Sequence, residues 1–228
     1  MIATLIANDF ARPRAKFHAR CRLTDKRHDI RDFLITDPTL AQALGRGAML
    51  HDTEETLLIS NDDEDLSVSL FLDRDMLQRV ESRRPLEKLR ANVLEDLWKV
   101  IEGVSHFSCV AWKAASDRTV SLLELELQGE IDKFVTTTLI AMQQMDKRLL
   151  RNLHGWLFDN VSFKDDLSDE QADRYRDAND YAARYCYGLR EQLMYDEMGA
   201  LAKLREFYRL QSGDKISHIR SELLAGRP

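Results

Sequence analysis

The chain has 228 residues, of which 44% are hydrophobic and 32% are charged, with only 9 glycines and 4 prolines. This composition is typical of a folded protein and excludes an intrinsically disordered chain. The net charge of −6 is uneven, because residues 1–31 carry +5 and the rest of the chain carries −11. An acidic body argues against long nucleic acids and anionic membranes as partners, since both attract cationic surfaces.

The spacing of the cysteines and the hydropathy of the chain indicate in which cellular compartment the protein is expected. Cys21, Cys109 and Cys186 are far apart in the sequence and form no Cys-x-x-Cys pair. They predict neither a disulfide framework nor a zinc site, and they indicate a reducing environment. No apolar run approaches the ~18 residues that a membrane span needs. We therefore expect a cytoplasmic protein without a membrane segment.

The first 23 residues contain an alternating basic pattern. Every even position from 12 to 22 is basic: Arg12, Arg14, Lys16, His18, Arg20 and Arg22. On a strand these side chains would share one face and could bind phosphates. Pro13 and the weak apolar face disfavour a strand. We favour an N-terminal basic arm without fixed structure at 1–23, or a start site assigned too far upstream.

From Thr24 the signals become conventional. Residues 29–47 contain two short helical stretches on either side of Asp37-Pro38, where proline interrupts a helix. Residues 55–60 and 65–72 alternate polar and apolar side chains around a short acidic stretch. This pattern predicts a β-hairpin.

A helix and a second hairpin are expected next. Pro85 is typical of a helix start, and apolar residues then recur at three- and four-residue steps as far as Gly103. Residues 106–114 and 118–127 resemble two further strands joined by a turn. Two β-hairpins flanking a helix predict a small antiparallel or mixed sheet in residues 24–128.

The rest of the chain, residues 129–228, is predicted to be mostly helical. Ser168 and Gln171 form a capping box before a long helix that extends to about Met198. No Gly/Pro/Ser-rich linker separates this region from the sheet region, so we expect the two to share one core. The fold class expected is α+β.

One acidic cluster resembles a chemical site. It consists of Glu124, Glu126, Glu130 and Asp132, with Lys133 beside them. On a strand, Glu124 and Glu126 would lie ~6.6 Å apart on one face. With Glu130 or Asp132 they could hold Mg²⁺ or Mn²⁺ in a metal-dependent phosphoester hydrolase. Alternating Glu and Leu is also typical of a half-exposed structural strand. We favour this structural interpretation, so no metal, cofactor or enzymatic activity is assigned.

A second cluster is rich in tyrosine and arginine. Residues 174–195 hold five of the six tyrosines and four arginines. Both residue types are enriched at the energetic centres of protein interfaces. The candidate binding residues are Arg174, Arg176, Tyr181, Arg184 and Tyr185.

Three interpretations of this second cluster remain open. The side chains could simply pack within the fold, they could contact a protein partner or a second copy, or the arginines could bind a small anion. Familiar cofactor motifs such as a P-loop or Gly-x-Gly-x-x-Gly are missing from the sequence. The leading hypothesis is a cytoplasmic binding or adaptor protein that self-associates through the helix 174–195. The alternatives are the metal-dependent hydrolase and, more weakly, a small-anion sensor.

Overall fold

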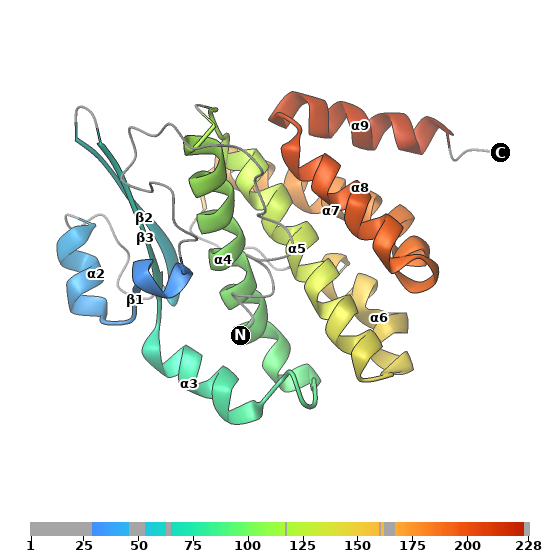
Figure 1. Cartoon of the computed structure of the whole chain (residues 1–228), viewed down its shortest axis with the longest axis horizontal. Coiled ribbons are helices and arrows are strands. Elements are labelled where there is room, and N and C mark those ends of the chain that lie inside the picture. Colours follow the sequence, from blue (N-terminus) through green and yellow to red (C-terminus); the bar gives the residue numbers. More distant parts are fainter. Residues whose placement is uncertain are drawn as a thin grey trace. The chain divides into compact units, whose positions relative to one another are not determined.

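The computed structural model describes residues 29–45, 53–62, 65–116, 118–159, 161 and 167–225. It contains two compact units, Met1–Thr119 and Val120–Pro228. Among the described residues, the first unit combines a small sheet with helices and the second is helical (Figure 1). The predicted α+β class is therefore confirmed. The predicted basic arm, residues 1–23, lies outside the described residues, and the shared core stays a prediction.

The sheet of the first unit is mixed, with the strand order β1-β3-β2. Its strands are β1 (Leu34–Ile35), β2 (Glu55–Asp62) and β3 (Asp65–Leu72). β2 and β3 pair antiparallel, which confirms the first predicted hairpin, and β1 pairs parallel with β3. Val68, Leu70 and Leu72 are buried at alternate positions of β3, as one face of a strand requires.

Helical segments accompany this sheet. They are η1 (Ile30–Phe33), α2 (Pro38–Leu44), α3 (Arg74–Arg83), η2 (Ala91–Val93) and α4 (Leu94–Ala114). Asp37 caps α2 by accepting hydrogen bonds from the backbone of the first turn, as its position before proline suggests. α3 was not predicted, although Asp73 caps it by accepting from the Met76 amide at 2.9 Å. α4 packs against β2 and β3 (Figure 1).

The second predicted hairpin is wrong. Residues 106–114 are the second half of α4, and residues 122–127 open helix α5 (Leu122–Gln143). The helix expected to begin at Pro85 begins only at Leu94, after a turn, and it continues through Gly103. Strand propensity depends on packing context more than helix propensity does, so short alternating segments are easily misassigned.

An ionic network in the first unit joins α3 and α4 to Glu54, the residue just before β2. The Arg79 guanidinium donates to Asp96 at 2.8 and 3.0 Å and to Glu54 at 2.6 Å. Lys99 donates to Glu54 at 2.8 Å. The hydrogen bond from Arg79 lowers the pKa of Asp96, and those from Lys99 and then Arg79 lower the pKa of Glu54.

These lowered pKa values predict acid destabilisation of the first unit. A carboxyl whose folded pKa is depressed contributes stability above its unfolded pKa, about 4, and loses it as pH falls through the folded pKa. We expect the free energy of unfolding to fall by about 1 kcal/mol below pH 4, a modest value because the network is partly exposed. Urea unfolding of the Trp156→Phe variant, in which Trp98 and Trp112 of the first unit report, measures this. Asp96→Asn should flatten the pH dependence, and an unchanged profile would contradict the prediction.

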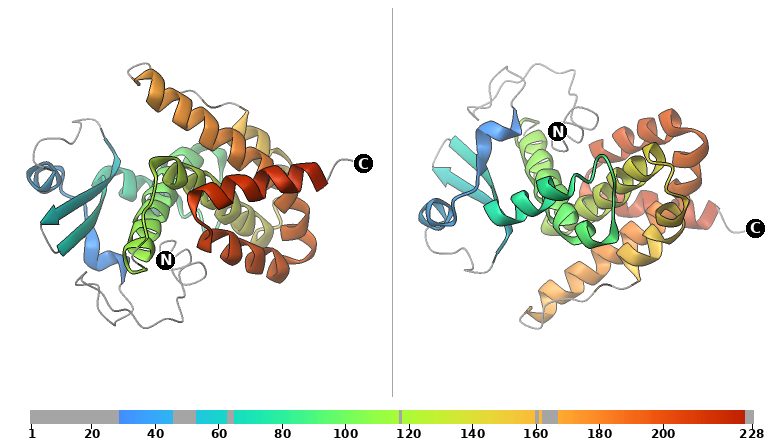
Figure 2. Two further views of the ribbon diagram at one scale, coloured as in Figure 1. Left: turned by 90° about the horizontal axis from the view of Figure 1, so that it is seen from above. Right: turned by 90° about the horizontal axis from the view of Figure 1, so that it is seen from below.

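The second unit is a helical bundle built around α5. Its helices are α5, α6 (Lys147–Phe158), α7 (Asp169–Tyr195), α8 (Glu197–Arg209) and α9 (Ser212–Ala225). α5 contacts both α6 and α7, and α7 also contacts α8 and α9. The predicted capping box of Ser168 and Gln171 is present at the start of α7. The first turns of α7 extend beyond the neighbouring helices of this unit (orange in Figure 2).

The first unit ends at Thr119. Residues 122–128, expected in the sheet region, belong to α5. Within the described ranges, no helix combines the length and the apolar character that crossing a membrane requires. The cytoplasmic location stays a prediction.

Candidate functional site

The acidic cluster lies on α5 and not on a strand. Ser121 caps this helix by accepting from the Glu124 amide at 3.1 Å. Because successive residues turn by about 100° on a helix, Glu126 lies about 200° around from Glu124. The strand geometry on which the alternative metal site depended is therefore absent. Glu124 and Glu126 do not share a face.

One face of α5 instead carries a buried polar chain that continues to α9. Glu124, Gln128 and Asp132 follow at four-residue steps and are all buried. The Lys215 ammonium lies 3.0 Å from a Glu124 carboxylate oxygen and donates to the Gln128 side-chain oxygen, also at 3.0 Å. The Gln128 amide nitrogen donates in turn to Asp132 at 3.0 Å. Lys215 is 0% exposed and Glu124 is 1% exposed, so this ion pair is shielded from solvent.

Glu130 and Lys133 form a separate pair on α5. The Lys133 ammonium donates to a Glu130 oxygen at 2.6 Å, and both side chains are largely buried. Cys186 on α7 is fully buried, and this burial, with Glu130 and Asp132 as smaller contributions, raises the pKa of its thiol. A thiol held in the neutral form is a poor nucleophile, so Cys186 acts as a core residue.

The arginines of the tyrosine- and arginine-rich helix do not converge on one point. Arg176 pairs with Asp173 at 2.6 Å and Arg184 pairs with Asp180 at 2.5 Å. Arg174 lies against the ring of Tyr175, next to it in the sequence. Arg174 and Arg184 are about 15 Å apart along the helix axis. This arrangement offers no shared anion site.

The two tyrosines that were singled out in the sequence have different environments. Tyr181 is half-buried, and its hydroxyl accepts a hydrogen bond from Arg220 of α9 at 2.6 Å. Tyr185 is only 4% exposed and stacks on Phe207 of α8 with ring centroids 4.3 Å apart. Tyr185 is therefore a core residue in this structure, and it is unsuited to contact a partner.

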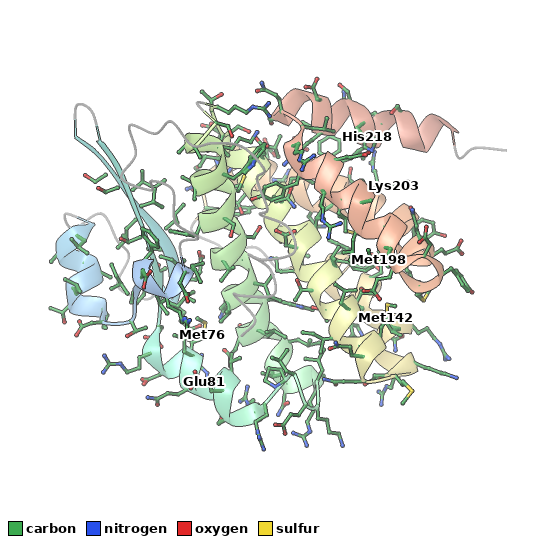
Figure 3. All side chains as sticks on the ribbon, viewed as in Figure 1. Met76, Glu81, Met142, Met198, Lys203 and His218 are labelled. Atoms are coloured by element: carbon green, nitrogen blue, oxygen red, sulfur yellow. The ribbon has the colours of Figure 1, made fainter. Side chains whose placement is uncertain are left out.

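The second half of α7 and the start of α8 expose apolar residues that were not among the candidates named from the sequence. Tyr187 is 71% exposed, and its ring is nearly perpendicular to that of His154 on α6, with the two ring centroids 5.8 Å apart. Met194, Tyr195 and Met198 are also exposed, and Met198 is the second residue of α8 (labelled in Figure 3). Scattered exposed apolar residues are normal, whereas a group on one surface indicates contact with another molecule.

An exposed glycine, Gly188, follows Tyr187 on α7. A Cβ atom built on Gly188 would have no atom within 4 Å, so the helix backbone is open to the outside there. The sequence shows the tyrosines and methionines of α7, but it does not show which of them are exposed, because that depends on which face of α7 packs on α5.

In comparisons with family models, with curated proteins and with solved structures, the chain has no match.

Proposed function

We propose that this chain is a cytoplasmic binding protein that self-associates through the outer face of α7, with a second copy as its partner. The observation that carries the proposal is one exposed row on this helix, formed by Arg184, Tyr187, Gly188 and Glu191. Residues spaced by three and four share one face of a helix. The row therefore offers an aromatic ring, an open backbone and both signs of charge together.

The row is complementary to itself. In a two-fold contact the same surface is used by both copies. If two α7 helices cross antiparallel with the axis between Tyr187 and Gly188, each Tyr187 ring packs on Gly188 of the second copy. The same axis puts Arg184 opposite Glu191 of the second copy, and Met194 opposite Tyr181. A flexible methionine beside an aromatic ring is a favourable contact.

The proposal refines the residues expected from the sequence. Arg184 and Tyr181 remain in the contact surface, and Tyr187 takes the place of the buried Tyr185. Arg174 and Arg176 lie about three to four turns from the crossing point, outside the centre of the contact. The open position at Gly188 is what permits the two helices to approach closely.

We expect Gly188→Gln to weaken self-association at least ~10-fold, because the new side chain fills the space that Tyr187 of the second copy needs. The monomer should fold normally, since nothing lies within 4 Å of the new Cβ and glutamine favours a helix over glycine. Sedimentation equilibrium over a micromolar concentration series measures the dissociation constant. Gly213→Gln is the matched control, because Gly213 is the other described helical glycine with open space around it. A wild type that is monomeric throughout would contradict the proposal.

A charge exchange tests the orientation of the contact. Arg184→Glu and Glu191→Arg should each weaken association several-fold, because each places like charges opposite one another. The double variant should recover most of the wild-type affinity, since the opposite charges face each other again with their positions exchanged. Equal weakening by the single and double variants would mean that Arg184 and Glu191 do not meet across the axis.

A further inference from the structure

The surroundings of Lys215 form a second site within the helical unit, separate from the outer face of α7. Its ammonium is held by one carboxylate and one amide oxygen, from Glu124 and Gln128, at 3.0 Å each. It also lies 5.5 Å from the ring centroids of both Phe207 and Tyr208 of α8. A carboxylate combined with aromatic faces is the arrangement that proteins use to recognise ammonium groups.

Neighbouring side chains fix the geometry of this site. Asp132 accepts from the Gln128 amide nitrogen, which turns the Gln128 oxygen toward the ammonium. Tyr185 stacks on Phe207, and His218 of α9 lies between α9 and α8 with its ring 5.8 Å from that of Phe207 (Figure 3). Fixed oxygen acceptors and fixed rings are what a preorganised binding site requires.

Lys215 reaches this site from a helix with few other interior contacts. Among the α9 side chains that the structure describes, Lys215 and Ile219 are the buried ones. Two further polar contacts of α9, Ser212 with Ser121 and Arg220 with Tyr181, lie at the surface. Among the described side chains of α9, Lys215 therefore supplies the buried ionic contact to the bundle.

We propose that α5 and α8 form a binding site for a primary alkylammonium group, which Lys215 of α9 occupies as an internal ligand. The ligand class is an unbranched alkyl chain ending in an ammonium, as in a lysine side chain. Glu124 supplies the charge, Gln128 supplies the second acceptor, and the two rings exclude water around the carbon next to the nitrogen. Such a site binds a lysine from another molecule whenever α9 leaves it. This inference does not depend on self-association through α7.

The test is chemical rescue of Lys215→Ala in the full chain. The substitution keeps the Cβ atom and removes a fragment equivalent to n-propylammonium, and engineered cavities bind molecules of the deleted shape. We expect n-propylammonium chloride to raise the melting temperature of this variant by about 3–5 °C, saturably and with one ligand per chain. If the variant is unfolded without amine, the site must instead restore its helical circular dichroism as n-propylammonium is added. Either result supports the site.

Three controls make the outcome decisive. n-Propanol has nearly the same shape without the charge and should have no effect on Lys215→Ala. The wild type, whose site is occupied, should not respond to n-propylammonium. Lys215→Ala/Glu124→Gln should bind the amine at least ~10-fold more weakly, because the carboxylate is gone. No melting shift and no recovery of folding in Lys215→Ala, or an equal shift in the wild type, would overturn the proposal.

Discussion

Lys215→Met is expected to lower the free energy of unfolding of the helical unit by about 3–5 kcal/mol. Methionine fills nearly the same volume as lysine, so the loss does not come from a cavity. It comes from Glu124, which is 1% exposed and would lose its buried ion pair with Lys215. Breaking a buried ion pair by removing one partner costs far more than the pair contributes, because the remaining charge has lost its water.

The measurement must isolate the helical unit. Trp156 lies on α6, whereas Trp98 and Trp112 belong to the first unit. In a Trp98→Phe/Trp112→Phe background, urea unfolding followed by fluorescence therefore reports on the helical unit alone. Fitting each unit separately avoids the assumption that the whole chain unfolds in one step.

The double variant Lys215→Met/Glu124→Gln separates charge from packing. Glutamine removes the buried carboxylate charge, and its amide can donate to the Gln128 oxygen that Lys215 has released. We expect the double variant to recover at least half of the lost stability, as a double-mutant cycle would reveal. If the double variant is as unstable as Lys215→Met, the buried charge is not the cause and the packing of α9 must be.

Part of the fold was predictable from local sequence signals and part was not. Local signals succeeded where one feature decided the structure, as for the cap at Asp37 and the capping box at Ser168. They failed for residues 122–127, where Leu and Glu alternate as on a strand. Two competing signals were present there: Leu, Glu and Gln favour helices, and Ser121 precedes Glu124 at capping-box spacing. The short alternating pattern was given too much weight.

The candidate sites depend on contacts that no local pattern encodes. Glu124 was selected from the sequence as a candidate acid, but its partner Lys215 lies 91 positions later and on another helix. Likewise, Tyr185 and Tyr187 are indistinguishable by composition, yet one stacks in the core and the other is exposed. A two-residue shift on a helix turns a side chain by about 200°, so the difference follows from which face of α7 packs on α5.

Gly103 was expected to end a helix, but it lies in the middle of α4, where that helix packs against the sheet. A Cβ atom at this position would lie 2.7 Å from Cγ of Glu55 on β2 and 2.9 Å from Cδ1 of Leu70 on β3. Leu70 is fully buried in the central strand and has little room to move. Glycine therefore permits the close approach of α4 to the hairpin.

Gly103→Val is accordingly expected to destabilise the first unit by about 2–3 kcal/mol, because the added atoms force the helix and the sheet apart. Urea unfolding of the Trp156→Phe background reports on that unit through Trp98 and Trp112, which both lie on α4. Gly188→Val is the matched control, since it makes the same change in a helix with nothing within 4 Å of the new Cβ. Because Gly188 lies in the helical unit, its effect is measured through Trp156 in the Trp98→Phe/Trp112→Phe background. Its effect should stay within about 0.5 kcal/mol, because valine and glycine differ only modestly in helix propensity. Equal effects at both positions would show that propensity, and not the contact with Glu55 and Leu70, determines the cost at Gly103.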